Sequence, residues 1–444
     1  MSKFTVRRLN DLIILLVFIT GFLSTFWYKQ LFRDGAPWAF RLFNLKDWVL
    51  DYPFIRYSST IVQTPAVIFA KLGASPQIVN WLYCLGYFIY PFIALVFLRF
   101  YLRKRGKSAL ILPLYISFFL TIIPTWAFAN SISSEAIVIF WFLYAYMIAE
   151  EKPKLMVMLL LGTLLLLSYE SSAIFYGLAC WILWREGKLN FRNFSLFVLL
   201  TILQAFNLLF KVMPERGHKF FESSIERSLH SPFWIMIIFL IPACFLLLRK
   251  NRKIQGGIIL LGTFLSGWTI LFLVQKDPGV LWGVSYDNRV WSIPVTFVIL
   301  WCFYEALRIR KFQAGIQYWL LTLICLLPGL YHEIKLSIDT YKVMGRINKA
   351  IDRNHGCVVL SLSEQQELRG NSYLPTWDLP YLSIVLQKDK KITTVMVNDY
   401  ISDGPKVLCS ITSDGRRLEY SDKYTVHGMR LKGNYDFSAL FTRK

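Results

Sequence analysis

The carboxylate of Glu170 lies between two strongly apolar runs in LLLLSYESSAIFYG, residues 164 to 177. A carboxylate at the centre of a helix in lipid costs about 2.5 to 3.5 kcal/mol, so we expect this side chain in a turn or a water-filled cavity. Held there, it could act as a general base toward a substrate hydroxyl. The structural alternative is that Glu170 only caps a helix that begins at Ser171 or Ser172.

Other charged residues also stand between apolar runs, where they could act on a bound substrate. A carboxylate among them could take the proton of an attacking hydroxyl, and a cation near the lipid headgroups could stabilise a departing phosphate. These residue types therefore favour acid–base and phosphate chemistry. The candidates are Asp34, Asp51, Arg56, Glu135, His218, Lys219, Asp287 and Arg289.

Several of these candidates have a purely structural explanation as well. Asp34 would cap the turn in FRDG, and Arg289 would be a helix-end arginine that pairs with Asp287. Glu135 follows SISS near a helix start, where a carboxylate interacts favourably with the helix dipole. His218 would be a solvated loop residue.

Sequence motifs for metals and nucleotides are absent. The chain has no HExxH, DxD, CxxC, GxxxxGK[ST] or dinucleotide-binding glycine loop, and its five histidines are scattered. Asp47 and Asp51 have i,i+4 spacing, which could bind Mg²⁺ or form a solvated helix face. We therefore expect no nucleotide substrate and no cofactor, with Mg²⁺ at these acids left open.

The elements that position these residues are apolar helices. Of 444 residues, 55% are hydrophobic and 17% aromatic, and several apolar runs approach the roughly 20 residues that cross about 30 Å of hydrocarbon. We predict an all-α polytopic membrane domain with about eleven transmembrane helices. The predicted spans are 11 to 28, 78 to 98, 108 to 128, 134 to 149, 155 to 168, 173 to 184, 194 to 212, 232 to 248, 255 to 274, 290 to 306 and 315 to 331.

Lysine and arginine gather in alternate loops, and the positive-inside rule places these loops in the cytoplasm. This arrangement explains most of the net charge of +21, and no nucleic-acid-binding motif accompanies that charge. The single N-x-S/T sequon, at Asn193, falls on the inner side, which favours a bacterial inner (plasma) membrane with the N-terminus in the cytoplasm. The basic segments are MSKFTVRR, RFYLRKRGK, EEKPK, REGKLNFR, RKNRK and RIRKF.

Two segments between the predicted spans are unusual in length. Leu155 to Trp184 offers 30 residues for a hairpin, whereas two crossings need about 40. The SYESS turn should then lie below the outer headgroups, buried in protein or lining a wet cavity. The outer loop from 29 to 77 is long, and its segments WAFRLFNLKDWVLDY and TPAVIFAKLG have the pattern of amphipathic helices lying in the membrane interface.

The composition changes after residue 331. HEIKLSIDTYKVMGRINKAIDRN predicts an amphipathic helix leaving the membrane, followed by short strands in CVVLSLS, YLSIVLQ, KITTVMVND, KVLCSIT and DKYTVHGMRL. We predict a transmembrane domain over 1 to 331 and a small mixed α/β extracytoplasmic domain over 332 to 444. In an oxidising compartment Cys357 and Cys409 could pair, or they could be core thiols.

Four features together resemble the GT-C superfamily of membrane glycosyltransferases. They are the long first outer loop with Asp34 just after the first span, the acid in a short hairpin, the DNR before a proline-containing span in SYDNRVWSIPVTFVILW, and the extracytoplasmic tail. The layout of residues 1 to 331 is similar to that of serotype-converting O-antigen glucosyltransferases. The resemblance implies an inverting enzyme that moves a hexose, for example glucose, from a polyprenyl-phosphate carrier to a cell-envelope glycan such as the O-antigen of lipopolysaccharide. It also implies that Asp34 is the catalytic base and that Arg289 contacts the lipid phosphate.

Two other functions fit a protein with many spans and an outer site. An O-antigen polymerase or ligase would be expected to carry a large central outer loop rich in Arg and His, whereas the longest outer segments here are the first loop and the tail. A non-catalytic flippase or transporter of a lipid-linked sugar would be expected to show an internal repeat and polar residues on both sides of mid-membrane.

Overall fold

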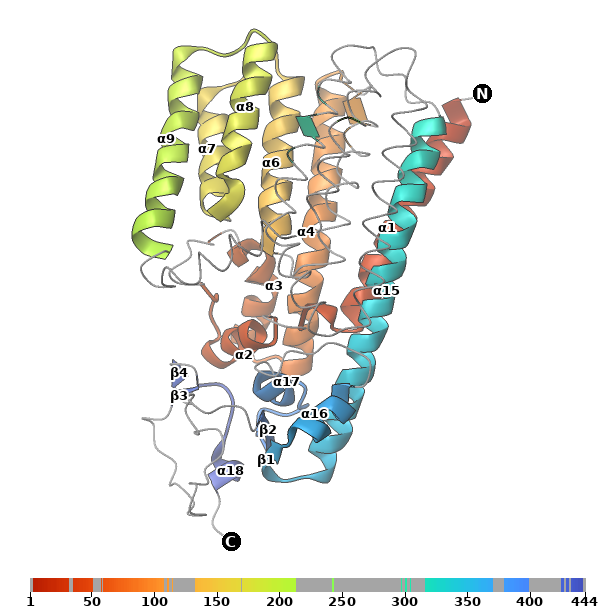
Figure 1. Ribbon diagram of the computed structural model, residues 1–444, viewed down its shortest axis with the longest axis vertical. Coiled ribbons are helices and arrows are strands. Elements are labelled where there is room, and N and C mark those ends of the chain that lie inside the picture. The colour runs from red at the N-terminus through yellow and green to blue at the C-terminus, as the bar shows by residue number, and fades with distance from the viewer. Residues whose placement is uncertain are drawn as a thin grey trace. The chain divides into compact units, whose positions relative to one another are not determined.

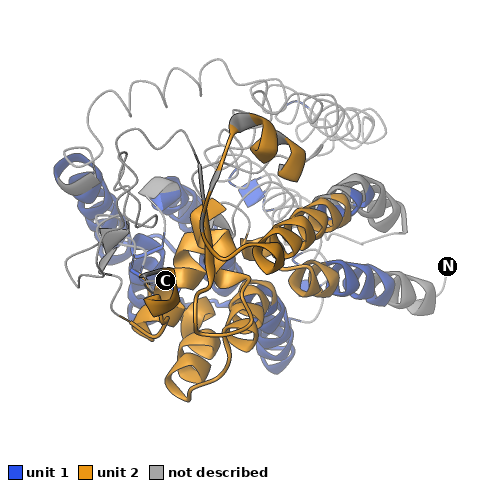
Figure 2. Cartoon of the chain, turned by 90° about the horizontal axis from the view of Figure 1, so that it is seen from below, with its two compact units in different colours: residues 1–20, 50–59, 89–333 blue, residues 21–49, 60–88, 334–444 orange. Residues whose placement is uncertain are grey.

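The computed structural model describes most of the first 212 residues and parts of the remainder, and the described part is mostly helical (Figure 1). The chain divides into two compact units, one of 1 to 20, 50 to 59 and 89 to 333, and one of 21 to 49, 60 to 88 and 334 to 444 (Figure 2). The second unit joins loop helices to the C-terminal segment. The division of the chain at 331 stays a prediction. The described residues are 3 to 31, 35 to 50, 57, 59 to 107, 110, 111, 114, 132 to 168, 170 to 212, 242, 297, 300, 301, 304, 316 to 369, 379 to 398, 425, 426, 429, 430 and 433 to 441.

Two helical segments are long and apolar enough to cross a membrane. They are α4 (Pro76–Lys104, 29 residues) and Phe191–Phe210 (20 residues). The second consists of α9 (Phe191–Asn207) and part of a π-helical continuation, η4 (Leu208–Val212). Both coincide with predicted spans. Four further apolar helical segments are shorter: Asp11–Phe26, Glu135–Ala149, Leu155–Leu166 and Ile174–Arg185.

The remaining predicted spans have mixed outcomes. Helix α1 (Lys3–Phe26) covers the first, and Phe18 of α1 meets Phe92 of α4 edge to face at 5.5 Å. The predicted span 315 to 331 and the predicted amphipathic helix after it form one continuous helix, α15 (Ile316–Arg353). The predicted spans that fall wholly or almost wholly outside the described residues are 108 to 128, 232 to 248, 255 to 274 and 290 to 306.

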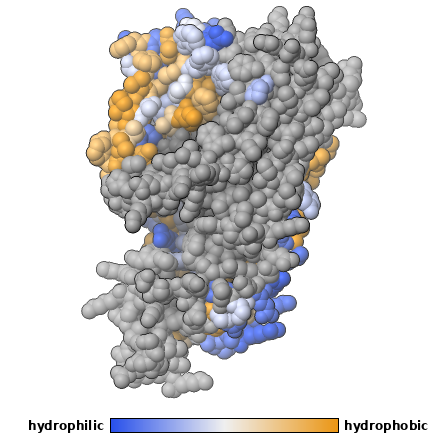
Figure 3. Space-filling model, viewed as in Figure 1, coloured by the Kyte–Doolittle hydropathy of each residue, from blue (hydrophilic) through white to orange (hydrophobic). Residues whose placement is uncertain are grey.

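Four consecutive helices of unit 1 form an up-and-down group because short loops connect them. Each of these helices runs antiparallel to the next one in the chain. Helices α6 and α8, which are separated by α7, therefore point the same way (Figure 1). Hydrophobic side chains cover the outer surface of this group, at the upper left of Figure 3. Such a surface is suited to lipid. The helices are α6 (Ile132–Ala149), α7 (Leu155–Leu166), α8 (Ile174–Arg185) and α9.

The hairpin of α7 and α8 is short, as predicted. Each helix has 12 residues, or about 18 Å, well below the roughly 30 Å of a hydrocarbon core. The 3₁₀ turn η3 (Glu170–Ala173) precedes α8. Ser168 and Ser172, both fully buried, donate hydrogen bonds to the carbonyl of Leu165 at 2.6 and 3.1 Å. These two serines of the turn are therefore packed inside protein.

The first loop contributes three elements to unit 2. Helix α2 is not the interfacial helix that its pattern predicted, because nine of its eleven residues are buried and it packs against a C-terminal helix, whereas an interfacial helix exposes its polar face. Helix α3 does expose apolar residues, among them Ile68 and Phe69. The elements are η1 (Lys29–Leu31), α2 (Gly35–Leu45) and α3 (Ser59–Lys71).

The C-terminal part of unit 2 mixes helices and short strands. Strand β1 pairs in parallel with β2, with Gly356 opposite Thr394, and β3 pairs antiparallel with β4. The prediction of a strand in YLSIVLQ is wrong, because its residues to Val385 belong to helix α17, whereas KVLCSIT lies outside the described residues. The elements after α15 are β1 (Gly356–Leu360), α16 (Leu362–Arg369), α17 (Leu379–Val385), β2 (Thr394–Asn398), β3 (Thr425–Val426), β4 (Met429–Arg430) and α18 (Ser438–Phe441).

Candidate functional site

Three of the basic loops meet at one end of unit 1. The Glu150 carboxylate accepts a hydrogen bond from the Tyr101 hydroxyl and pairs with Arg105 Nε at 2.7 Å. Lys188 Nζ lies 3.1 Å from the carbonyl of Met147 and 3.5 Å from a carboxylate oxygen of Glu186. These contacts join RFYLRKRGK, EEKPK and REGKLNFR, and we call this the basic end.

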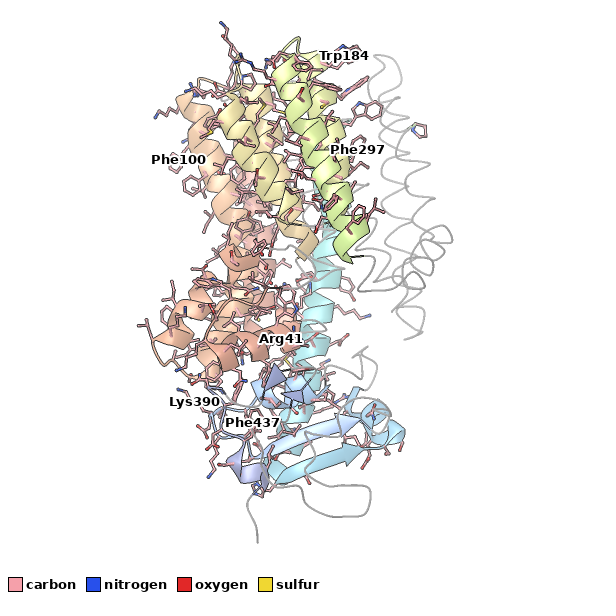
Figure 4. The ribbon with its side chains drawn as sticks, turned by 90° about the vertical axis from the view of Figure 1, so that its left-hand side faces the viewer. Arg41, Phe100, Trp184, Phe297, Lys390 and Phe437 are labelled. Carbon is pink, nitrogen blue, oxygen red and sulfur yellow. The ribbon has the colours of Figure 1, made fainter. Side chains whose placement is uncertain are left out.

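The basic end also carries exposed aromatic residues. Trp184 is 56% exposed, and the Arg185 guanidinium lies over the rings of Trp181 and Trp184 at 5.6 and 5.9 Å (Figure 4). Tryptophan and arginine of this kind are typical of a membrane–water interface. Asn193 of the sequon is instead buried, with its amide donating to the carbonyl of Lys188.

Residues of the predicted span 290 to 306 reach the basic end too. The Tyr304 hydroxyl donates to the Glu186 carboxylate at 2.8 Å, and Leu300 accepts a hydrogen bond from the Tyr144 hydroxyl at 3.2 Å. Leu300 and Tyr304 are buried. The C-terminal side of that predicted span therefore lies beside α6 and the loop after α8.

The opposite end of the four-helix group holds two of the predicted site residues. Phe140 of α6 stacks on Phe175 of α8, with ring centroids 4.2 Å apart and an interplanar angle of 8°. Glu135 and Glu170 each lie five residues earlier in the chain. Because α6 and α8 run in the same direction, both glutamates fall about 8 to 10 Å beyond this stack, at one level. We call this the acidic end.

The Glu135 side chain is almost completely buried. It stands in the first turn of α6, which is the helix-dipole position that the sequence predicted. Its exposed fraction is only 1%, and Tyr90 of α4 lies within its electrostatic range. A favourable dipole does not require such burial, and burying a carboxylate is costly unless neighbouring groups compensate it.

The described backbone places Glu170 at the start of a helical turn. Glu170 opens η3, which leads directly into α8 at Ile174. The N-cap residue of α8, Ala173, forms no side-chain cap. The Glu170 side chain lies outside the described set, so its catalytic role and its capping role both stay predictions.

Two polar residues at the acidic end were missed by the sequence analysis. Tyr176 of α8 stacks on Phe197 of α9 at 6.0 Å, and η3 packs against α9, so the next two turns of α9 lie beside η3. Those turns carry Gln204 and Asn207, which are 2% and 7% exposed. Asn207 Oδ1 is buried and accepts no hydrogen bond. The sequence pattern that could have identified them is the i,i+3 spacing of two amide side chains in an otherwise apolar helix.

Of the predicted site residues, Glu135 is described with its side chain and Glu170 by its backbone alone; the others lie outside the described residues. They are Asp34, Asp51, Arg56, His218, Lys219, Asp287 and Arg289. The roles assigned to them remain predictions. The same holds for pairing of Cys357 with Cys409, whose side chains are also outside the described set.

Within the described ranges, no group of three or more His, Cys, Asp or Glu side chains could hold a metal ion. The polar groups at the acidic end are carboxylates, amides and hydroxyls, which can exchange protons with or hydrogen-bond to a hydroxylated substrate. Comparisons of the chain with family models, with curated proteins and with solved structures found no match.

Proposed function

We propose that the protein is a multi-pass membrane glycosyltransferase of the GT-C type, which moves a hexose from a polyprenyl-phosphate carrier to an extracytoplasmic glycan such as O-antigen. The observation that carries the proposal is that Glu135 and Glu170 share one level of unit 1, at the end opposite the basic loops. A bacterial inner membrane with about eleven spans is part of this proposal.

The charge difference between the two ends supports an outer reaction site. Lysine- and arginine-rich loops remain in the cytoplasm, so a basic cytoplasmic end would direct Glu135 and Glu170 outward. Free nucleotide sugars are cytoplasmic, and the sequence has no nucleotide motif. A donor that is already attached to lipid fits both facts.

The proposed reaction is a single displacement at the anomeric carbon. An acceptor hydroxyl oxygen forms the new bond to that carbon, and the bond from the carbon to the phosphate oxygen breaks with its electron pair. The hydroxyl proton goes to a carboxylate, for which Asp34 and Glu170 are the candidates. Attack opposite the leaving phosphate inverts the anomeric configuration.

The remaining predicted residues would bind the substrates. Arg289 would stabilise the departing phosphate, because a guanidinium matches phosphate oxygens with two parallel hydrogen bonds. The other proposed substrate-binding residues are Asp51, Arg56, Glu135, His218, Lys219 and Asp287.

The test is hexose transfer by membranes supplied with the lipid-linked donor and a glycan acceptor. We expect Asp34→Asn and Glu170→Gln to lower the rate by about 100-fold or more, as loss of a general base does. Glu151→Gln, a matched change of an exposed glutamate at the basic end, should leave the rate unchanged. Full transfer by both site variants would refute the proposed site, whereas carrier binding without any product would favour a transporter.

A further inference from the structure

Arg41 is the only charged residue of α2 (Figure 4). The side chain as a whole is partly buried, and its Nε is buried. Within the described part of the chain this Nε has no hydrogen-bond partner and Arg41 forms no ion pair. A guanidinium N–H withdrawn from water normally donates to a carboxylate or another acceptor.

Two further donors at the same helix lack an acceptor. Asn434 Nδ2 and the Tyr435 hydroxyl are both buried, and neither has a hydrogen-bond partner among the described residues. Their backbone is fixed on α2, because Asn434 N donates to the carbonyl of Asn44 at 2.8 Å and Tyr435 N donates to Asn44 Oδ1 at 3.2 Å. A Cβ at Gly433 would lie 2.1 Å from Asn44 Oδ1, so only glycine allows this approach.

Phe40 is the common contact of the aromatic residues around these donors. The rings of Tyr435 and Tyr381 each have their centroid 5.5 Å from that of Phe40, and Arg41 is close enough to Tyr381 to interact electrostatically. Burial raises the pKa of Tyr381 to about 12 and raises the pKa of Tyr435 as well. Both phenols therefore keep their protons at neutral pH and can donate.

The three partnerless groups share one chemical character. Each can donate hydrogen bonds, and one carries a permanent positive charge. Leaving a buried donor without an acceptor is unfavourable, so such groups are typical of a site that a ligand completes. A ligand with several acceptor oxygens and negative charge would satisfy them, and arginine is especially suited to phosphate.

We propose that Arg41, Asn434 and Tyr435 form a binding site for a phosphoryl group, supplied either by free phosphate or by a lipid headgroup. The site belongs to unit 2 and is independent of the proposed transferase activity. It uses α2 and residues 434 and 435, which are distant in the sequence but joined through Asn44.

The experiment measures thermal unfolding of the full-length protein in detergent as inorganic phosphate replaces chloride at constant ionic strength. Ligand binding to the folded state raises the melting temperature with ligand concentration. We expect this rise in the wild type and in Lys71→Gln, a control that removes an exposed cation of the same unit. Arg41→Gln should weaken phosphate binding by about tenfold or more, as loss of a charge-assisted bond does.

The Tyr435→Phe variant distinguishes a ligand-binding role of the Tyr435 hydroxyl from a purely structural one. Without phosphate this variant should melt at the same or a higher temperature, because it removes a buried hydroxyl that has no partner. Its response to phosphate should nevertheless be smaller than that of the wild type. If Arg41→Gln does not fold, Arg41→Lys keeps the charge, loses the paired donors and should bind more weakly.

A second arm identifies the source of the phosphoryl group. The protein is placed in nanodiscs of phosphatidylcholine with or without phosphatidic acid, and retained lipid is counted by native mass spectrometry. Retention of phosphatidic acid that depends on Arg41 assigns a lipid headgroup, and a response to inorganic phosphate alone assigns free phosphate. Equal responses of wild type and Arg41→Gln in both arms, or no response in either, would overturn the proposal.

Discussion

Phe140 and Phe175 stack face to face, 4.2 Å between ring centroids, and thereby set the register of two parallel helices. Each ring follows a glutamate by five residues, so Glu135 and Glu170 are aligned by the same contact. Both rings are fully buried, and large buried aromatic pairs contribute strongly to packing. The alignment of Glu135 with Glu170 along the helices therefore depends on buried side-chain packing between α6 and α8.

This register predicts a cross-link between the two acid positions. In a cysteine-free background, the Glu135→Cys, Glu170→Cys protein should react with a short bifunctional maleimide to give an internal cross-link visible by mass spectrometry. Glu135→Cys combined with Trp184→Cys is the control, because Trp184 lies near the other end of α8. Equal cross-linking of both pairs, or of the control alone, would contradict the register.

The proposed sidedness predicts which ends a membrane-impermeant reagent reaches. In intact cells with a permeabilised outer membrane, a cysteine at position 170 should be labelled, whereas a cysteine at 152 in the basic end should react only after the inner membrane is opened. The reason is that the lysine-rich loop resists translocation. Labelling of position 170 only from the cytoplasm would refute the proposed outer site.

The sequence was sufficient to predict the parts that depend on local pattern. Long apolar runs predicted α4 and α9, and chain length alone predicted the short hairpin of α7 and α8. The position of Glu135 in the first turn of α6 followed from SISSEA. These features depend on hydropathy and capping, which a single sequence contains.

The errors arise where a distant segment changes the environment. The pattern of α2 is amphipathic, but α17 and residues 434 to 437 cover it, and no local signal predicts a partner so far along the chain. YLSIVLQ is a short and mostly apolar run, so its periodicity cannot distinguish strand from helix. All seven residues of α17 are buried, and Pro380 near its start suits a helix.

Gly86 should be required where α4 packs on α3, because a larger residue would not fit there. A Cβ there would lie 2.0 Å from the backbone carbonyl oxygen of Val62, and backbone cannot rotate away. We expect Gly86→Ala to destabilise the fold by roughly 1 to 3 kcal/mol or more, as overpacking does. Gly345→Ala is the matched helical control, with no atom within 4 Å of its Cβ, and should stabilise by about 0.5 to 1 kcal/mol. Thermal unfolding, monitored by tryptophan fluorescence, measures the stability of both variants. Equal effects of the two substitutions would contradict this packing.

Stability of unit 2 should depend on alkaline pH through Tyr381 and Tyr435. Burial raises the pKa of Tyr381 to about 12 and also raises the pKa of Tyr435, whereas an unfolded tyrosine titrates near about 10. Above pH 10 the unfolded chain loses protons that the folded chain keeps, so stability is constant below about pH 10 and falls as pH rises toward 12. The Tyr381→Phe, Tyr435→Phe protein should show a shallower fall in melting temperature over this window. An unchanged slope would show that other groups control alkaline unfolding.

Asn207 should affect activity and stability in opposite ways. Its buried Oδ1 accepts no hydrogen bond from the described residues, so Asn207→Leu, which keeps the branched shape of the side chain, should leave the melting temperature unchanged or raise it. If the carbonyl accepts a hydrogen bond from a substrate hydroxyl, hexose transfer should fall by about tenfold, the effect of roughly 1.4 kcal/mol. Thr201→Val, a change on the exposed side of the same helix, should keep full transfer. The opposite result is a variant of Asn207 that is less stable but transfers hexose at an unchanged rate per folded molecule. That result would show that the amide has a structural role and does not bind a substrate hydroxyl.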